Sequence, residues 1–258
     1  MDLQQFLTLF AAALGGGGTV KLADIAYQEY RAWTSRRSSS IQNIDQILEP
    51  LLKAADELVG KLRSLAEQDF APIHHADVSN LDDQRFASVV YLFVQFWSQV
   101  EITRFRGMSV SVARSKRGQW TQAFLTCLES RRVRLIDRIS QRALGEAVLI
   151  DGRPMNFVEF IRCYDTDPYL KRWLAPLLAV LAKVKNPAER QRILQYAIVV
   201  HAMIDTLDTR HLVTRSRPAT PNKLNTKSWR DLNYRVFGVY LGFVRNRSKY
   251  IGPPKRRP

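Results

Sequence analysis

The sequence has little cysteine, and it lacks the short motifs that mark common catalytic sites. Its two cysteines, Cys127 and Cys163, cannot staple a small secreted fold, and their apolar surroundings favour reduced thiols in a cytosolic compartment. The sequence contains no phosphate loop G-x-x-x-x-G-K-[ST], no G-x-S-x-G elbow, no H-E-x-x-H and no C-x-x-C pair. These absences favour a non-catalytic protein without a cofactor, and an enzyme is only the third functional interpretation.

Acidic residues are scarce in the second half of the chain, so the net charge of +15 is unevenly spread. Residues 1–100 carry 8 Lys and Arg against 12 Asp and Glu, whereas residues 101–258 carry 31 against 12. Residues 209–258 hold 13 basic residues and one acid, Asp231. A segment with this charge repels itself and attracts a polyanion, such as an anionic membrane, nucleic acid or an acidic protein.

Long uncharged stretches are also rare, and only one is long enough to suggest a membrane span. The 18 residues from Leu3 to Val20 carry no charge, and a spanning helix needs about 20 apolar residues. Basic residues follow this stretch while only Asp2 precedes it, so the positive-inside rule places the bulk of the chain in the cytoplasm. A helix buried in the protein core and a cleaved signal peptide are the alternatives. The candidate anchor residues are Leu3, Phe6, Leu7, Leu9, Phe10, Leu14 and Val20.

The rest of the sequence predicts an all-α fold, a helical bundle of about six helices. Apolar residues recur at three- and four-residue steps over 41–65 and 86–100, which is typical of buried helix faces. We expect Phe93, Phe96, Trp97 and Val100 to be buried against the 41–65 helix. The apolar pattern over 120–144 predicts one long helix with an arginine-rich face.

Local signals predict where several helices begin and where the chain turns. Asp and Asn side chains cap helix N-termini, and proline is favoured at the first helical position. An Asp-Gly pair favours a tight turn between two extended segments. The predicted caps are Asp82 or Asp83, Asn156, Asp167 before Pro168 and Asn186 before Pro187, and the predicted turn is Asp151-Gly152.

Four potential metal ligands follow one another near the end of a predicted helix that starts at Pro187 and runs to about Thr209. His201, Asp205, Asp208 and His211 are separated by steps of four, three and three, so one helix face could present them together. Imidazole and carboxylate groups are ligands for zinc and iron. No second cluster completes a two-helix site, so these residues are weak candidates and no metal is expected.

The basic C-terminal tail contains a predicted amphipathic segment. Trp229, Leu232, Val236, Val239 or Tyr240, and Phe243 recur at helical spacing among basic residues. Such a segment can lie on an anionic membrane, stack its aromatic rings on single-stranded nucleic acid, or dock its apolar face on the bundle. The predicted contacts to an anionic surface are Arg230, Arg235, Arg245, Arg247, Lys249, Lys255, Arg256 and Arg257.

Four segments carry a resemblance to a group of proteins. They are the N-terminal hydrophobic stretch with Gly15–Gly18, LEPLLKAADEL at 48–58, YLFVQFWSQVEITR at 91–104 and RALGEAV at 142–148. In these segments the chain resembles uncharacterised bacterial proteins that have a short hydrophobic N-terminus and a cytoplasmic helical region. The resemblance implies an anchor and a cytoplasmic compartment, and it implies no activity.

Together these patterns predict three regions: a hydrophobic helix and stalk over 1–33, a cytoplasmic helical bundle over 34–208 and a basic tail over 209–258. The expected function is a non-catalytic interaction module, anchored by a single membrane pass and facing the cytoplasm. The expected partners are the anionic inner leaflet and a possible protein. The alternative is a soluble nucleic-acid-associated protein whose N-terminal helix belongs to its core.

Overall fold

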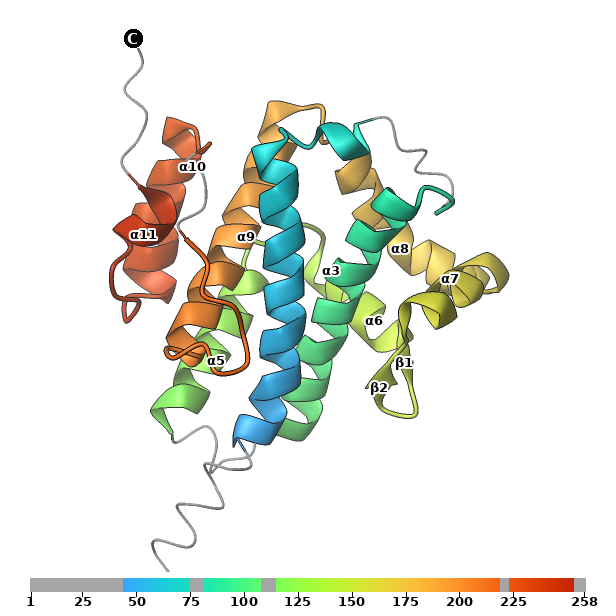
Figure 1. The fold of residues 1–258 in the computed structure, drawn as a ribbon, viewed down its shortest axis with the longest axis horizontal. Helices are drawn as coiled ribbons and strands as arrows, with labels where there is room; N and C mark the ends of the chain where they lie inside the picture. The colour runs from blue at the N-terminus through green and yellow to red at the C-terminus, as the bar shows by residue number, and fades with distance from the viewer. Residues whose placement is uncertain (1–43, 75–80, 108–114, 219–222, 253–258) are drawn as a thin grey trace, which may run out of the picture. The chain divides into compact units, whose positions relative to one another are not determined.

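The computed structural model describes residues 44–74, 81–107, 115–218 and 223–252. Contacts divide the chain into two compact units, residues 1–45 and residues 46–258, and nearly all described residues belong to the second. This unit is mostly helical, which confirms the all-α prediction (Figure 1). The elements of the described residues are a helix over 44–67, η1 (Ala71–Ile73), α3 (Gln84–Ile102), η2 (Thr103–Gly107), α5 (Lys116–Leu128), α6 (Arg138–Ala147), β1 (Leu149–Ile150), β2 (Arg153–Pro154), α7 (Phe157–Thr166), α8 (Pro168–Ala182), α9 (Pro187–Leu207), α10 (Thr226–Arg230), η3 (Asp231–Tyr240) and α11 (Ser248–Ile251).

Side-chain caps mark the N-termini of several helices. Asp83 caps α3 by accepting hydrogen bonds from the amides of Arg85 and Phe86. Asn156 and Glu159 form a reciprocal capping box at the start of α7. Asp167 and Asn186 cap α8 and α9, each with proline at the first helical position. These hydrogen bonds confirm the predicted caps. The caps could be predicted from the sequence because each depends on only a few adjacent residues.

The predicted turn at Asp151-Gly152 is also confirmed. Both residues have positive φ, 51° and 75°, and they join β1 to β2 as an antiparallel pair. Positive φ at both central residues is the geometry of a type I′ turn, whose twist matches that of the two strands. This short hairpin leads the chain from α6 to α7.

The core is built around aromatic residues of α3 and α9. Phe93, Phe96, Trp97 and Val100 are all buried, as predicted. The Trp97 indole N–H donates a 2.7 Å hydrogen bond to the hydroxyl of Tyr196, which also contacts the Phe93 ring. Because both polar groups are satisfied, the tryptophan and the tyrosine can be fully buried.

Helix α3 packs closely along α6, and α5 packs along α9 (Figure 1). A Cβ at Gly145 of α6 would lie 2.8 Å from the Trp97 carbonyl oxygen, so only glycine fits this crossing. The C-terminal elements α10 and α11 lie against α9, while η3 contacts α5. The basic segment therefore packs on the bundle over residues 223–252.

The single long helix predicted over 120–144 is wrong. Helix α5 ends at Leu128, and α6 begins ten residues later at Arg138 with Asp137 as its cap. Between the two helices, Glu129 is buried and hydrogen-bonded to Arg142, which folds α6 back toward the end of α5. Ile139, which the pattern placed on the buried face, is 64% exposed.

Among the helices of the described ranges, none has the length and apolar character needed to span a bilayer. The predicted anchor, from Leu3 to Val20, lies outside the described residues. The anchor therefore stays a prediction from the sequence.

Candidate functional site

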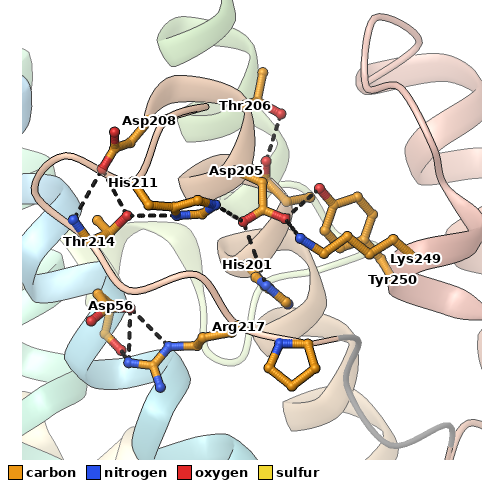
Figure 2. Close-up of polar contacts among 12 residues, drawn as sticks. Asp56, His201, Asp205, Thr206, Asp208, His211, Thr214, Arg217, Lys249 and Tyr250 are labelled. Carbon is orange, nitrogen blue, oxygen red and sulfur yellow. Dashed lines mark hydrogen bonds and ion pairs between the residues drawn. The ribbon is translucent and has the colours of Figure 1, made fainter.

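Asp205, near the end of α9, is the centre of a polar cluster that joins three segments of the chain (Figure 2). Its Oδ2 atom accepts a 2.9 Å hydrogen bond from the Tyr250 hydroxyl and forms an ion pair with Lys249, both on α11. Its Oδ1 atom lies 3.7 Å from Nε2 of His201 and 3.6 Å from Nε2 of His211. The Asp205 side chain is only 10% exposed, so the cluster holds the C-terminal segment against α9.

His201 is the most buried member of this cluster, at 2% exposure, and its ring packs edge-on against Tyr250. Neither ring nitrogen has a hydrogen-bond partner within the described part of the chain. Burial lowers the pKa of His201 below its ordinary value of 6.5, and this effect exceeds the opposing attraction of Asp205. His201 is therefore neutral at neutral pH, and Lys249 forms a direct ion pair with Asp205.

Asp208 serves a separate purpose from Asp205. It lies just after α9, and its carboxylate accepts hydrogen bonds from the amides of Leu212, Val213 and Thr214 and from the Thr214 hydroxyl. Burial alone would raise the pKa of Asp208, but these hydrogen bonds outweigh it and the pKa is lowered. Asp208 therefore shapes the loop that follows α9.

The four metal candidates of the sequence do not share one helix face, because α9 ends at Leu207. His201, Asp205 and His211 converge, the last from the following loop at a positive φ of 51°, whereas the carboxylate of Asp208 is engaged by that loop. Across 44–74, 81–107, 115–218 and 223–252, no group of three or more His, Cys, Asp or Glu side chains is arranged to hold a metal ion.

A second tether joins the loop after α9 to the 44–67 helix (Figure 2). Arg217 donates hydrogen bonds of 2.8 and 2.9 Å to the carboxylate and the backbone carbonyl of Asp56. A Cβ at Gly60 would lie 2.9 Å from the Arg217 guanidinium, so the glycine makes room for this arginine. Arg217 is one of the basic residues of the tail, and its charge is neutralised inside the protein.

The amphipathic segment of the tail is wound more widely than an α-helix. Residues of η3 form a π-helix, in which Leu241 N–H donates to the carbonyl of Val236, five residues earlier. The buried apolar residues accordingly form two pairs whose members are five residues apart, 232 with 237 and 236 with 241. They are Leu232, Val236, Phe237 and Leu241.

This winding turns a different set of residues toward solvent from the set that an α-helix would expose. Tyr234, Val239 and Tyr240 are 63%, 74% and 40% exposed. The predicted apolar stripe included Val239 or Tyr240, and the structure corrects that assignment because the period is longer than 3.6 residues. Phe243, by contrast, is docked between Trp120 and Phe124, with ring centroids 5.6 and 5.5 Å away.

The outer face of the C-terminal segment therefore combines exposed rings with exposed arginines. We define this outer face as Tyr234, Val239 and Tyr240 together with Arg230, Arg235 and Arg245, all exposed. Arg235 forms a 3.1 Å ion pair with Asp231, the one acid of the segment, and remains 56% exposed. A surface of this composition can contact an anionic membrane or nucleic acid.

The other predicted anionic contacts have different positions. Arg247 is half-buried and donates to the Gly242 carbonyl, and Lys249 is paired with Asp205. Lys255, Arg256 and Arg257 lie outside the described residues. The Trp229 indole N–H donates a 2.6 Å hydrogen bond to the Gly252 carbonyl, which fixes this ring within the fold.

The sequence patterns did not identify a second buried carboxylate, Glu129. Arg142 donates two hydrogen bonds to it, of 2.7 and 2.8 Å, and Arg104 and Arg138 lie 2.6 and 3.5 Å from its oxygens. Burial alone would raise the pKa of Glu129, but the arginines outweigh it and the pKa is lowered. The spacing of Arg138 and Arg142, four residues apart on one helix, was the available signal for this group.

Comparisons of the chain with protein-family models, with curated proteins and with solved structures found no match. Its function is therefore inferred from the two buried carboxylate clusters and from the outer face. The Asp205 cluster fixes the position of the C-terminal segment. The outer face is one part of the surface that this arrangement leaves exposed.

Proposed function

We propose that this protein is a non-catalytic helical module held at the cytoplasmic face of a membrane, where its outer face contacts anionic lipid. The observation that carries the proposal is the exposure of Tyr234, Val239 and Tyr240 among the arginines of the same segment. The uncharged Leu3–Val20 stretch supports attachment to the membrane through the N-terminus.

The composition of the outer face suits the boundary between water and lipid. Tyrosine is favoured there because its ring is apolar and its hydroxyl is polar. Each arginine close to an anionic leaflet contributes about 1 kcal/mol. Arg230, Arg235 and Arg245 would together contribute about 3 kcal/mol, less the part that the Asp231 pair takes from Arg235.

The contact is made by a folded surface and not by a free amphipathic helix. Leu232, Val236 and Phe237 are buried in the bundle, so they are not available to lipid. Lys249 and Tyr250 bind Asp205 and hold the end of the segment in place. We therefore expect the outer face to bind without unfolding from α9.

Nucleic acid is the second candidate partner, favoured by the two exposed tyrosines. Tyr234 and Tyr240 could stack on single-stranded bases while the arginines contact phosphates. Such binding would weaken steeply with salt as the number of phosphate contacts rises. Attraction to an anionic membrane is also screened by salt, so a direct competition is needed.

The test is the partition of the full chain between buffer and vesicles, with and without phosphatidylglycerol. The ratio of the two partition coefficients isolates the contribution of anionic lipid from that of the N-terminal stretch. We expect the triple variant Arg230→Gln, Arg235→Gln, Arg245→Gln to lower this ratio by about a hundredfold, since three arginines contribute about 3 kcal/mol.

A matched variant controls for net charge. Arg85, Arg162 and Arg172 are exposed on α3, α7 and α8, and their triple replacement by Gln removes the same charge. We expect this variant to have nearly the same ratio of partition coefficients, with and without phosphatidylglycerol, as the wild-type chain. Equal losses in both variants would reject the outer face as the contact. Displacement of the wild-type chain from vesicles by single-stranded RNA of equal total charge would favour nucleic acid.

A further inference from the structure

Arg104, Arg138 and Arg142 surround Glu129 at the edge of an open cavity of about 400 Å³. This volume lies within the range of small-molecule sites, which is about 300 to 1,000 Å³. The lining comes from η2, α5, α6, η3 and the start of the α5–α6 connection. It includes Arg104, Arg138, Arg142, Glu129, Ser130 and Tyr240, together with hydroxyl and amide side chains of α5.

The charges that line the cavity do not cancel. Three guanidinium groups face one ionised carboxylate, Glu129, which leaves two positive charges. The neighbouring Glu101 lies 3.7 Å from Arg104 but does not line the cavity, so the lining itself keeps an excess of positive charge. The cavity therefore matches a ligand with a charge of minus two.

The donors that line the cavity are also of the kind that binds phosphate. The Ser130 hydroxyl is buried and has no hydrogen-bond partner within the described part of the chain. Arg138 is 54% exposed and lies 3.5 Å from Glu129, so its guanidinium can turn toward a ligand. Arginine binds phosphate oxygens through two parallel hydrogen bonds, and hydroxyl and amide groups add further donors.

We infer that this cavity binds a phosphate monoester group, held by Arg138, Arg142 and Arg104 beside Glu129. A phosphate monoester carries close to two negative charges at neutral pH, whereas a phosphodiester carries one. The bound group could be the headgroup of a lipid such as phosphatidic acid or a free phosphorylated metabolite.

The lipid form of this inference rests on the proposed function, through Tyr240. This residue belongs to the outer face and also lines the cavity, so a headgroup could enter where the outer face meets the leaflet. Both π-helical segments contribute to the site, η2 through Arg104 and η3 through Tyr240. Segments of this kind are found frequently at functional sites.

The test is titration calorimetry of the full chain in phosphate-free buffer, with glycerol 3-phosphate and with the phosphodiester glycerophosphoglycerol. We expect glycerol 3-phosphate to bind more tightly. Arg138→Gln should weaken its binding by about tenfold, since one charged hydrogen-bonding partner is lost. Arg138→Lys, which keeps the charge but loses the planar fork, should give an intermediate loss.

Arg132→Gln is the matched control, because Arg132 is exposed in the same connection and does not line the cavity. Arg138 is more than half exposed, so its replacement should leave the fold intact, which the melting temperature checks. Absence of glycerol 3-phosphate binding by the wild-type chain, or an equal loss in Arg132→Gln and Arg138→Gln, would overturn the inference.

Vesicles separate the two sources of the phosphate and separate this inference from the proposed function. A preference for phosphatidic acid over phosphatidylglycerol at equal surface charge, lost in Arg138→Gln, supports the lipid headgroup. Binding of glycerol 3-phosphate without that preference supports a free metabolite. Vesicle binding without any phosphate monoester binding rejects the cavity and leaves the proposed function standing. Phosphate monoester binding with no anionic-vesicle binding supports the cavity as a binding site and rejects the proposed function.

Discussion

Two largely buried carboxylates, Asp205 on α9 and Glu129 at the end of α5, are each contacted by several basic side chains. Asp205 is enclosed by His201, His211 and the α11 residues Lys249 and Tyr250, which come from segments that it ties together. Glu129 is held by arginines at the edge of an open cavity. Similar ion pairs therefore fasten the C-terminal segment at Asp205, whereas at Glu129 they line a cavity that is open to solvent.

The two clusters also differ in how their charge is balanced. Asp205 forms its direct ion pair with Lys249, and burial lowers the pKa of the neighbouring His201. Glu129 has three arginines within 3.5 Å, so its surroundings stay positive after pairing. We conclude that a balanced cluster is suited to fastening the C-terminal segment, while an unbalanced one is suited to binding an anion.

The largest effect should come from removing Glu129. Glu129→Ala leaves Arg104, only 17% exposed, and Arg142 without their main partner, and we expect a loss of about 3 kcal/mol in the free energy of unfolding. Asp205→Asn should cost about 1 to 2 kcal/mol, because Lys249 is 29% exposed and can be rehydrated. Urea denaturation of both variants measures this difference.

Inorganic phosphate sharpens the same comparison. If the Glu129 cavity is an anion site, added phosphate should restore part of the lost stability of Glu129→Ala, because it replaces the missing carboxylate. It should restore none in Asp205→Asn. Equal recovery in both variants would show that phosphate acts through general ionic effects and would contradict the distinction between the clusters.

A smaller effect, on pH dependence, should come from His201. Its folded pKa lies below 6.5, so below pH 6.5 the unfolded chain binds a proton that the folded chain does not. The free energy of unfolding should therefore fall as pH drops from 6.5 toward the folded pKa. His201→Gln should remove this part of the slope, whereas the wild-type slope persisting in the variant would assign it to other groups.

Acid should weaken the Glu129 cluster in a lower pH range, which begins near the lower end of the His201 range. The folded pKa of Glu129 lies below its ordinary value of 4.5 because Arg142 and Arg104 outweigh its burial. Its contribution to stability is present above pH 4.5 and is lost as pH falls through the folded pKa. Denaturation curves of wild type and His201→Gln across both ranges distinguish the two contributions.

The sequence predicted the features that depend on adjacent residues. Asp83, Asn156 and the Asp151-Gly152 turn each act through backbone groups within a few positions, so their type alone was informative. The burial of Phe93, Phe96 and Trp97 followed from helical periodicity in the same way. These predictions required no knowledge of distant contacts.

The features that were missed depend on distant contacts or on an unusual helix. Glu129 interrupts the expected long helix because Arg142 and Arg104 bind it, and Arg104 is 25 positions away. Val239 or Tyr240 was assigned to an apolar face because the pattern assumed the α-helical period, whereas η3 is a π-helix. The spacing of Arg138 and Arg142 was the one local signal for the Glu129 group, and η3 had none.

The most direct test of the outer face as a membrane contact uses an environment-sensitive dye on Val239, which is 74% exposed on η3. Cys163→Ser removes the less buried native thiol, and Val239→Cys then carries the dye in the full chain, with Val158→Cys on α7 as the matched exposed control. We predict a blue shift at position 239 in phosphatidylglycerol vesicles and little change at position 158. An unchanged spectrum at 239, or equal shifts at both positions, would contradict the account.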